Sequence, residues 1–188
     1  MGKYILATVT RLSINHGQRH IYVAHSDMKQ IISIHDTAHL HKFLQEKKKT
    51  IVLTGGCFDI LHIGHISLFE HAKKQGDTLI VLLESDSSIA KQKGRERPIH
   101  SQLQRATVLS AIKYIDYIVM LPSTMTNESY DILVKALQPD IIATTESDPG
   151  VLHKKRQAKL IHARLVFVNK VIPNISTSRI ASAIEKEL

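Results

Sequence analysis

From residue 51 onward, short apolar runs rich in β-branched residues alternate with longer segments whose apolar residues recur at helical spacing. This alternation is typical of parallel strands joined by crossover helices, because strands covered on both faces are apolar throughout. The pattern therefore predicts an α/β fold built on a doubly wound parallel sheet of five strands. The expected strands cover residues 51–55, 78–84, 117–121, 140–143 and 165–169.

Helices are expected between these strands and after the last one. Ser101 and Gln104 have the spacing of a capping box, in which each side chain bonds the other residue's backbone N–H. Ser176 precedes an apolar-periodic tail, where it would act as an N-cap. The expected helices cover residues 64–74, 101–114, 128–137, 150–162 and 176 to the C-terminus.

The first 48 residues show a different pattern, with three short strand-like runs separated by turn residues. The runs cover residues 4–14, 20–25 and 30–35, and Asp36 or Thr37 would cap a short helix that follows them. We therefore expect residues 1–48 to form a small antiparallel β subdomain and residues 49–188 to form the main domain. Oligomerisation is one role that such a subdomain could have.

The composition indicates a globular chain, with 43% hydrophobic residues. No apolar stretch approaches the roughly 20 residues of a membrane helix, and the N-terminus does not have the pattern of a secretory signal. We therefore expect a cytoplasmic protein that does not enter the membrane. Cys57 is the single cysteine, which excludes an internal disulfide and is compatible with a reducing compartment.

The formal net charge of +8 favours negatively charged partners without choosing among nucleotides, sugar phosphates, nucleic acid and membranes. Basic residues cluster at 47–49, 91–97 and 153–164. The last cluster has helical spacing, so it is either a solvated helix face or a surface for phosphate or nucleic acid. Nucleic acid is the less expected partner, because charged helix faces are common.

The segment with the clearest chemistry is residues 54–65, a glycine pair and a turn between a buried strand and a helix. Gly55 and Gly56 remove side chains where backbone would approach an anion. His62 and His65, with Gly64 between them, can direct two ring donors at one phosphate. Ligands of doubly wound sheets bind beyond the carboxyl ends of the strands, where a helix N-terminus favours negative charge. The segment therefore predicts a phosphate-binding turn.

Other interpretations of these residues exist. Two histidines three apart also occur as metal ligands or as ordinary surface residues. The ten further histidines are not joined by cysteines or carboxylates at ligand spacing, so no metal site is predicted. Cys57 has no neighbouring acid–base partner and is expected to line the site rather than to act as a nucleophile.

Three stretches carry a resemblance to a known family. GGCFDILHIGH, residues 55–65, resembles the HxGH signature of the cytidylyltransferase-like nucleotidyltransferases. Residues 91–121 resemble the following segment of glycerol-3-phosphate cytidylyltransferases and of the nucleotidyltransferase domain of ADP-heptose synthases, and ISTSRI, residues 175–180, resembles their ISTT signature. The resemblance covers about residues 51–188 in the expected order and implies a Rossmann-like fold.

The resemblance also implies a reaction, in which the phosphate of an acceptor attacks the α-phosphate of ATP or CTP and pyrophosphate leaves. In such enzymes catalysis is mainly positioning and electrostatic stabilisation. His62, His65 and Lys93 are the implied catalytic residues, and Mg²⁺ would accompany the triphosphate. The residues implied to bind the nucleotide are Gly56, Cys57, Phe58, Gly64, Arg105, Ile175, Ser176, Thr177 and Ser178.

The acceptor would be a sugar or polyol phosphate, bound by Asp59, Lys91 and Lys113. For Asp59 an alternative is that it orders the turn through bonds to the backbone. For Arg105 and Lys113 the alternative is an ion pair on a helix surface. Frequent dimerisation in the family also makes a homodimer the expected assembly.

The resemblance leaves the substrates open, because the chain departs from the family at one loop. ADP-heptose synthases usually have lysine and then Gly-Gly-Asp after the fourth strand, whereas this chain has residues 144–148 with the sequence TTESD. The GRERP stretch favours a heptose-phosphate adenylyltransferase, while KQK favours a glycerol-phosphate cytidylyltransferase. A nucleotide-binding regulatory protein without turnover and a nucleic-acid-binding protein are the rival hypotheses.

Overall fold

The computed structural model describes residues 30–169, 177, 179 and 180. In this part of the chain, six strands form one all-parallel sheet in the order β1-β4-β3-β2-β5-β6. The strands are β1 Gln30–Ser33, β2 Ile51–Gly56, β3 Thr78–Leu83, β4 Tyr117–Met120, β5 Ile141–Thr145 and β6 Arg164–Asn169. The predicted α/β, Rossmann-like class is confirmed.

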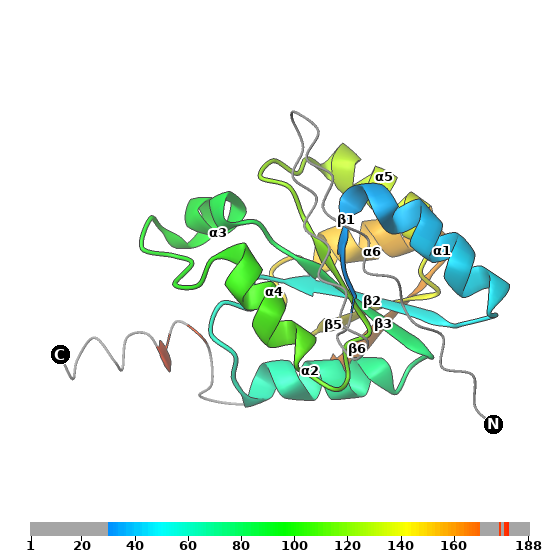
Figure 1. Ribbon diagram of the computed structural model, residues 1–188, viewed down its shortest axis with the longest axis horizontal. Helices are drawn as coiled ribbons and strands as arrows, with labels where there is room; N and C mark the ends of the chain where they lie inside the picture. Colours follow the sequence, from blue (N-terminus) through cyan, green and yellow to red (C-terminus); the bar gives the residue numbers. More distant parts are fainter. Residues whose placement is uncertain (1–29, 170–176, 178, 181–188) are drawn as a thin grey trace, which may run out of the picture.

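Helices cover both faces of this sheet (Figure 1). Leucines and other apolar side chains of α1 and α5 pack on one face, and those of α2 and α4 pack on the other. Helix α6 contacts α5, β5 and β6. The helices are α1 Thr37–Glu46, α2 Ile63–Lys73, α3 Asp86–Lys93, α4 Gln102–Ser110, α5 Asn127–Leu137 and α6 Val151–Leu160, with the single 3-10 turn η1 Ile34–Asp36 in the described residues.

The apolar runs form strands because their side chains are covered on both sides. All six residues of β3 are buried, and Phe69 of α2 is completely buried against the same face as Val81 and Leu83. Such a strand has no polar position to present to water, as its continuous apolar sequence indicates. The capping box that Ser101 and Gln104 predict is present at the start of α4.

The first strand corrects one prediction. Residues 30–33 were expected in an antiparallel meander, but they form β1 and pair in parallel with β4 at one edge of the main sheet. An apolar run indicates that a strand is buried, but it does not indicate whether the neighbouring strand is parallel or antiparallel. Helix α1 supplies the crossover connection that a parallel strand requires. The sheet therefore has six strands rather than five. For residues 1–29 the predicted subdomain lies outside the described residues and stays a prediction.

Helix boundaries differ from expectation in two further places. The expected helix over 101–114 ends at Ser110, four residues early, and α3 forms between residues 84 and 101, where no helix was expected. Helix α3 has few apolar residues. Its N-cap is Ser85, whose hydroxyl accepts the N–H of Ser88. Most of the expected C-terminal helix, with its predicted cap Ser176, lies outside the described residues.

The topology locates the place where a ligand binds such a sheet. Strand β2 lies between β3 and β5, so the chain leaves β2 toward one half of the sheet and later returns to its other side. A crevice opens at this reversal, beyond the carboxyl ends of the strands. Across the described ranges, none of the helices is long and apolar enough to cross a membrane. Cytoplasmic location and dimerisation stay predictions.

Candidate active site

A cleft of about 650 Å³ opens at the reversal point. Its floor is formed by residues at the ends of β2 and β5, including Thr54 and Thr144. One wall comes from the turn into α2 and from α3, and the other comes from the β5–α6 loop and α6. The cleft is therefore placed where the sheet topology predicts a ligand.

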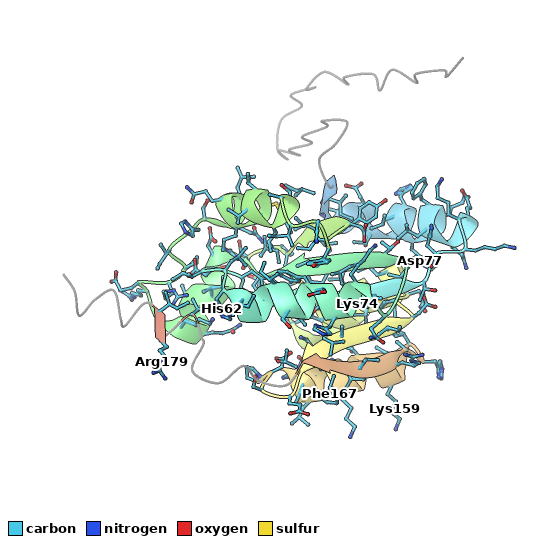
Figure 2. All side chains as sticks on the ribbon, turned by 90° about the horizontal axis from the view of Figure 1, so that it is seen from below. His62, Lys74, Asp77, Lys159, Phe167 and Arg179 are labelled. Atoms are coloured by element: carbon cyan, nitrogen blue, oxygen red, sulfur yellow. The ribbon has the colours of Figure 1, made fainter. Side chains whose placement is uncertain are left out.

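The two predicted histidines lie together in this cleft. His62 is the N-cap of α2, and the rings of His62 and His65 stack with their centroids 3.9 Å apart and an interplanar angle of 25°. Figure 2 shows His62 and Lys74 at opposite ends of α2, and His62 is the one that lines the cleft. The pair stands at the positive end of the helix dipole, which favours an anion.

Local bonds set the state of both rings. Nδ1 of His62 accepts the N–H of Gly64 at 3.2 Å, so a neutral ring carries its proton on Nε2 and can donate there. Nδ1 of His65 is buried and has no hydrogen-bond partner within the described part of the chain. A buried polar atom without a partner costs about 1–3 kcal/mol, and such atoms concentrate at functional sites.

Burial keeps the pair uncharged at neutral pH. Desolvation lowers the pKa of His62 below its ordinary value. Desolvation, followed by the charges of His62 and Lys93, lowers the pKa of His65 to about 4. A phosphate chain bound against the rings would bring negative charge close to them and would favour their protonation.

Two glycines make room for this arrangement. A Cβ on Gly64 would lie 3.0 Å from Cε1 and Nδ1 of His62, so the ring can fold back only over a glycine. A Cβ on Gly56 would lie 3.0 Å from the ring of Phe58. Phe58 adopts a positive φ of 47° and its ring is buried against His65 and Phe69, so the side chain holds the turn while the backbone faces the cleft.

Cys57 and Lys93 lie on the same side of the cleft. Both line it, and the ammonium of Lys93 is close enough to bond the thiol. Burial raises the pKa of Cys57 above its ordinary value, and the charge of Lys93 only partly opposes this. The thiol therefore stays protonated, which supports its predicted role as a lining residue.

Arg105 is completely enclosed beneath the site. Its guanidinium donates to the carbonyl oxygens of Cys57 at 2.6 Å, Glu84 at 2.8 Å and His100 at 3.0 Å, and to a carboxylate oxygen of Asp86 at 2.7 Å. It is 1% exposed and does not line the cleft. The predicted direct contact of Arg105 with the nucleotide is therefore replaced by an internal role, which is to hold three loops together.

Asp59 is likewise turned inward. Its carboxylate accepts the backbone N–H groups of Ile99 and His100 and pairs with Arg97 at 2.7 Å. Burial would raise the pKa of Asp59, but these donors lower it below the ordinary value. The alternative interpretation of Asp59, ordering of a loop through backbone bonds, agrees with these contacts, and binding of the acceptor does not.

The divergent loop is ordered by one carboxylate. Asp148 accepts the hydroxyl of Thr144 at 2.6 Å and the N–H of Gly150 at 2.7 Å, and it pairs with Lys154 of α6. Nζ of Lys154 also lies 3.4 Å from the carbonyl oxygen of Gly55. Burial would raise the pKa of Asp148, but Lys154 and the other donors lower it. The loop thus brings a lysine into the cleft from the helix that follows.

The remaining predicted residues are divided. Thr177 lines the cleft, and its hydroxyl donates to the carbonyl oxygen of Ile60 at 3.3 Å. Lys91 is exposed on α3 and does not line the cleft. Lys113 lies over the ring of Tyr114 shortly before β4 begins, at the amino edge of the sheet and opposite the cleft. Ile175, Ser176 and Ser178 lie outside the described residues.

Several lining residues were not predicted. Glu84 and Tyr130 meet at the α3 side of the cleft, where the phenol donates to the carboxylate. Asn127 lines the same side, and His153 and Lys154 line the opposite one. The basic cluster at 153–164 had the pattern of a solvated helix, and only the inward positions of α6 near its start contribute to the cleft.

Comparison with known proteins agrees with this geometry. The cytidylyltransferase-like family matches residues 53–183. The chain is 36% identical over 173 residues to a protein of Helicobacter hepaticus named bifunctional protein HldE, with 89% of this chain and 34% of the relative covered. It is 46% identical over 99 residues to a protein of the same name from Campylobacter jejuni subsp. doylei, covering 53% of this chain and 21% of the relative.

Two solved structures have a similar fold. The lipopolysaccharide core biosynthesis protein from Thermoplasma volcanium has a TM-score of 0.52 and 28% identity, covering 66% of this chain and 99% of that protein. A pantoate-beta-alanine ligase from Francisella tularensis has a TM-score of 0.56 and 16% identity, covering 82% of this chain and 76% of that protein, and shows the fold alone.

The HldE proteins named above are much longer than the matching region, since this chain covers 34% of one and 21% of the other. The similarity therefore concerns one part of each relative. Within this chain, the family match extends from β2 to beyond β6 and contains both histidines of the cleft. The chain belongs to the cytidylyltransferase-like family and is a nucleotidyltransferase enzyme.

Proposed function

We propose that this enzyme transfers AMP or CMP from a nucleoside triphosphate to the phosphate of a sugar or polyol and releases pyrophosphate. The observation that carries the proposal is the stacked pair of His62 and His65 at the start of α2. A heptose 1-phosphate adenylyltransferase is the favoured form, because the long relatives carry the name HldE. A glycerol-3-phosphate cytidylyltransferase is the second form, supported by the KQK stretch.

The reaction needs two anions to meet in one cleft. An oxygen of the acceptor phosphate forms a bond to the α-phosphorus, and the bond from that phosphorus to the oxygen bridging to the β-phosphate breaks. Negative charge grows on the leaving pyrophosphate. Nε2 of His62 and the ring of His65 would stabilise this charge, and the ammonium of Lys93 would reduce the repulsion between the phosphates that meet in the cleft.

Mg²⁺ is proposed as the ion that accompanies the triphosphate and reduces its charge. The donors of the cleft suit a metal held by phosphate oxygens and water, since no group of three or more His, Cys, Asp or Glu side chains among the described residues could hold one directly. The protein's own contribution is then to position the phosphates with the histidines and the helix N-terminus.

A panel of reactions tests the proposal. The full chain would be mixed with each of the four nucleoside triphosphates and with heptose, hexose and glycerol phosphates, and pyrophosphate release would be measured. We expect release with ATP or CTP and one acceptor class. His65→Ala should lower kcat by about a hundredfold, because one lost donor to the transition state costs about 3 kcal/mol.

A matched substitution outside the cleft provides the control. His162→Ala replaces an exposed histidine after α6 and should leave the rate unchanged. Tight nucleotide binding without release of pyrophosphate from any pair would instead support the regulatory protein. Binding of random oligonucleotides that weakens steeply with salt, together with no turnover, would support the nucleic-acid hypothesis.

A further inference from the structure

The cleft contains one carboxylate, that of Glu84, for which the described residues provide no ion pair. Glu84 follows β3 and lines the cleft. Its Oε1 accepts the hydroxyl of Tyr130 and its Oε2 accepts the hydroxyl of Ser88 at 2.8 Å. Neither partner is charged, and across residues 30–169 none of the salt bridges includes Glu84. Among the described residues, no cation therefore pairs directly with this carboxylate.

This charge does not suit a cleft that binds only phosphates. Like charges in a partly dry site repel, so Glu84 would weaken the binding of any anion placed against it. Lys93 lies on the same side of the cleft, and both its charge and that of Glu84 act on Cys57. A molecule on this side would therefore meet a cation at one point and an anion at another.

The other side chains around Glu84 are neutral and polar. Gln92 of α3 and Asn127 of α5 line the same side, and each amide can both donate and accept. Tyr130 is held as a neutral phenol, because burial and the bond to Glu84 raise its pKa. A carboxylate among amides can accept from hydroxyl groups, while the amides can donate to and accept from them.

We propose that Glu84, with Gln92 and Asn127, binds the hydroxyl groups of the acceptor, whose phosphate lies toward Lys93. The acceptor is then a neutral sugar or polyol carrying one phosphate. An acceptor with a carboxylate at this point would be repelled by Glu84. A phosphorylated quaternary amine would find a counter-ion there, but it has no O–H or N–H group on the cation with which to bond the two amides. The inference rests on the proposed function and deepens it.

Binding measurements separate the contributions of charge and hydroxyl groups. Mannose 1-phosphate, inorganic phosphate and phosphocholine would each be titrated into the full chain with a non-hydrolysable ATP analogue and, separately, a CTP analogue. We expect wild type to bind mannose 1-phosphate at least about tenfold more tightly than phosphate, since hydrogen bonds from hydroxyls to a charged group are stronger than those between neutral groups.

Two substitutions change the two contributions separately. Glu84→Gln keeps the size of the side chain but removes its charge and replaces one acceptor oxygen by an amide N–H, to which one of the two hydroxyls must then turn as an acceptor. It should therefore abolish the preference for mannose 1-phosphate while strengthening the binding of inorganic phosphate. Asn127→Ala should reduce the preference by about tenfold without changing phosphate binding, because it alters no charge. Glu128→Gln, at an exposed position of α5 outside the cleft, is the matched control and should change neither affinity.

Two results would overturn the inference. One is an unchanged preference in Glu84→Gln, and the other is a wild-type chain that prefers phosphocholine to mannose 1-phosphate. The proposed function is judged separately by pyrophosphate release. Turnover with an unchanged preference in Glu84→Gln would reject only the hydroxyl subsite. A preference that Glu84→Gln abolishes, without any turnover, would reject only the proposed reaction.

Discussion

The guanidinium of Arg105 and the carbonyl oxygen of Cys57 lie 2.6 Å apart, although 48 positions separate them in the chain. The same side chain donates to the carbonyl oxygen of Glu84, so one residue of α4 fixes the backbone that follows β2 and the backbone that follows β3. Cys57 belongs to the turn that leads to the histidines. The positions of His62 and His65 therefore depend on a residue that does not line the cleft.

Arg105→Lys should show this dependence. A lysine keeps the charge but cannot reach three carbonyls with a planar fork, so buried acceptors lose their donors. We expect the free energy of unfolding to fall by about 2 kcal/mol, measured by urea denaturation, together with a reduced kcat. Lys113→Arg, a comparable exchange at the amino edge, should change neither. Unchanged stability in Arg105→Lys would show that the internal bonds contribute little.

Gly64→Ala should affect stability and activity in opposite directions. Alanine is favoured over glycine in a helix by about 1 kcal/mol, so α2 itself should not be weakened. The new methyl group would lie 3.0 Å from the ring of His62, which must move. We expect an unchanged or higher thermal midpoint and a kcat lowered by about tenfold or more, because small misplacements of reacting groups are costly. An unchanged kcat would contradict the proposed role of the ring's position.

Nucleotide binding should take up protons at mildly acid pH. The folded pKa of His65 is about 4, below the ordinary value of 6.5 because of burial and the charges of His62 and Lys93. A bound triphosphate would raise it, since an opposite charge favours the protonated ring. Calorimetry at pH 6 in buffers of different ionisation enthalpy would measure the uptake. His65→Gln should reduce it, and equal uptake in that variant would contradict the assignment.

The same shift has a consequence for stability without ligand. The unfolded chain binds a proton at His65 near pH 6.5, whereas the folded chain does so only near pH 4. The contribution of this neutral imidazole to the free energy of unfolding is therefore complete above pH 6.5, and it is lost as the pH falls from 6.5 toward 4. Urea denaturation midpoints over this range should decrease less steeply in His65→Gln than in wild type.

Two neighbouring lysines should differ in effect. Lys93 lines the cleft, whereas Lys91 is exposed on the same helix and does not. We expect Lys93→Gln to lower kcat/KM by about a hundredfold, as expected for a charged group near the phosphates. Lys91→Gln, the matched variant, should change kcat/KM less than about threefold, because an exposed charge is screened by salt. A larger decrease of kcat/KM in Lys91→Gln would support the original prediction that Lys91 binds the acceptor.

The sequence could predict the central strands and the histidine turn because their signals are local. Strand β3 is apolar throughout, and the residues between Gly55 and His65 occupy a single strand–turn–helix unit. The direction of β1 could not be predicted, because it depends on pairing with β4, far along the chain. Helix α3 was missed because its sequence is polar and its start depends on the bonds of Ser85.

The errors among the site residues have a similar cause. Asp59 and Arg105 have the charge of substrate ligands, and only their partners in distant loops show that they are internal. Glu84 and Tyr130, 46 positions apart, are brought together by the ends of different elements. Lys113 is a different case, since a residue just before a parallel strand lies at the edge opposite the ligand and could have been excluded from its position alone.

Because the cleft lies at the reversal of strand order, its two walls come from separate stretches of the chain. One wall follows β2 and β3, while the other follows β5, and the histidines occupy only the first. A substitution in the loop around Asp148 can therefore alter what that wall binds without disturbing the two histidines. The architecture thus allows the pocket for one ligand to change in sequence while the turn that holds the two histidines stays the same.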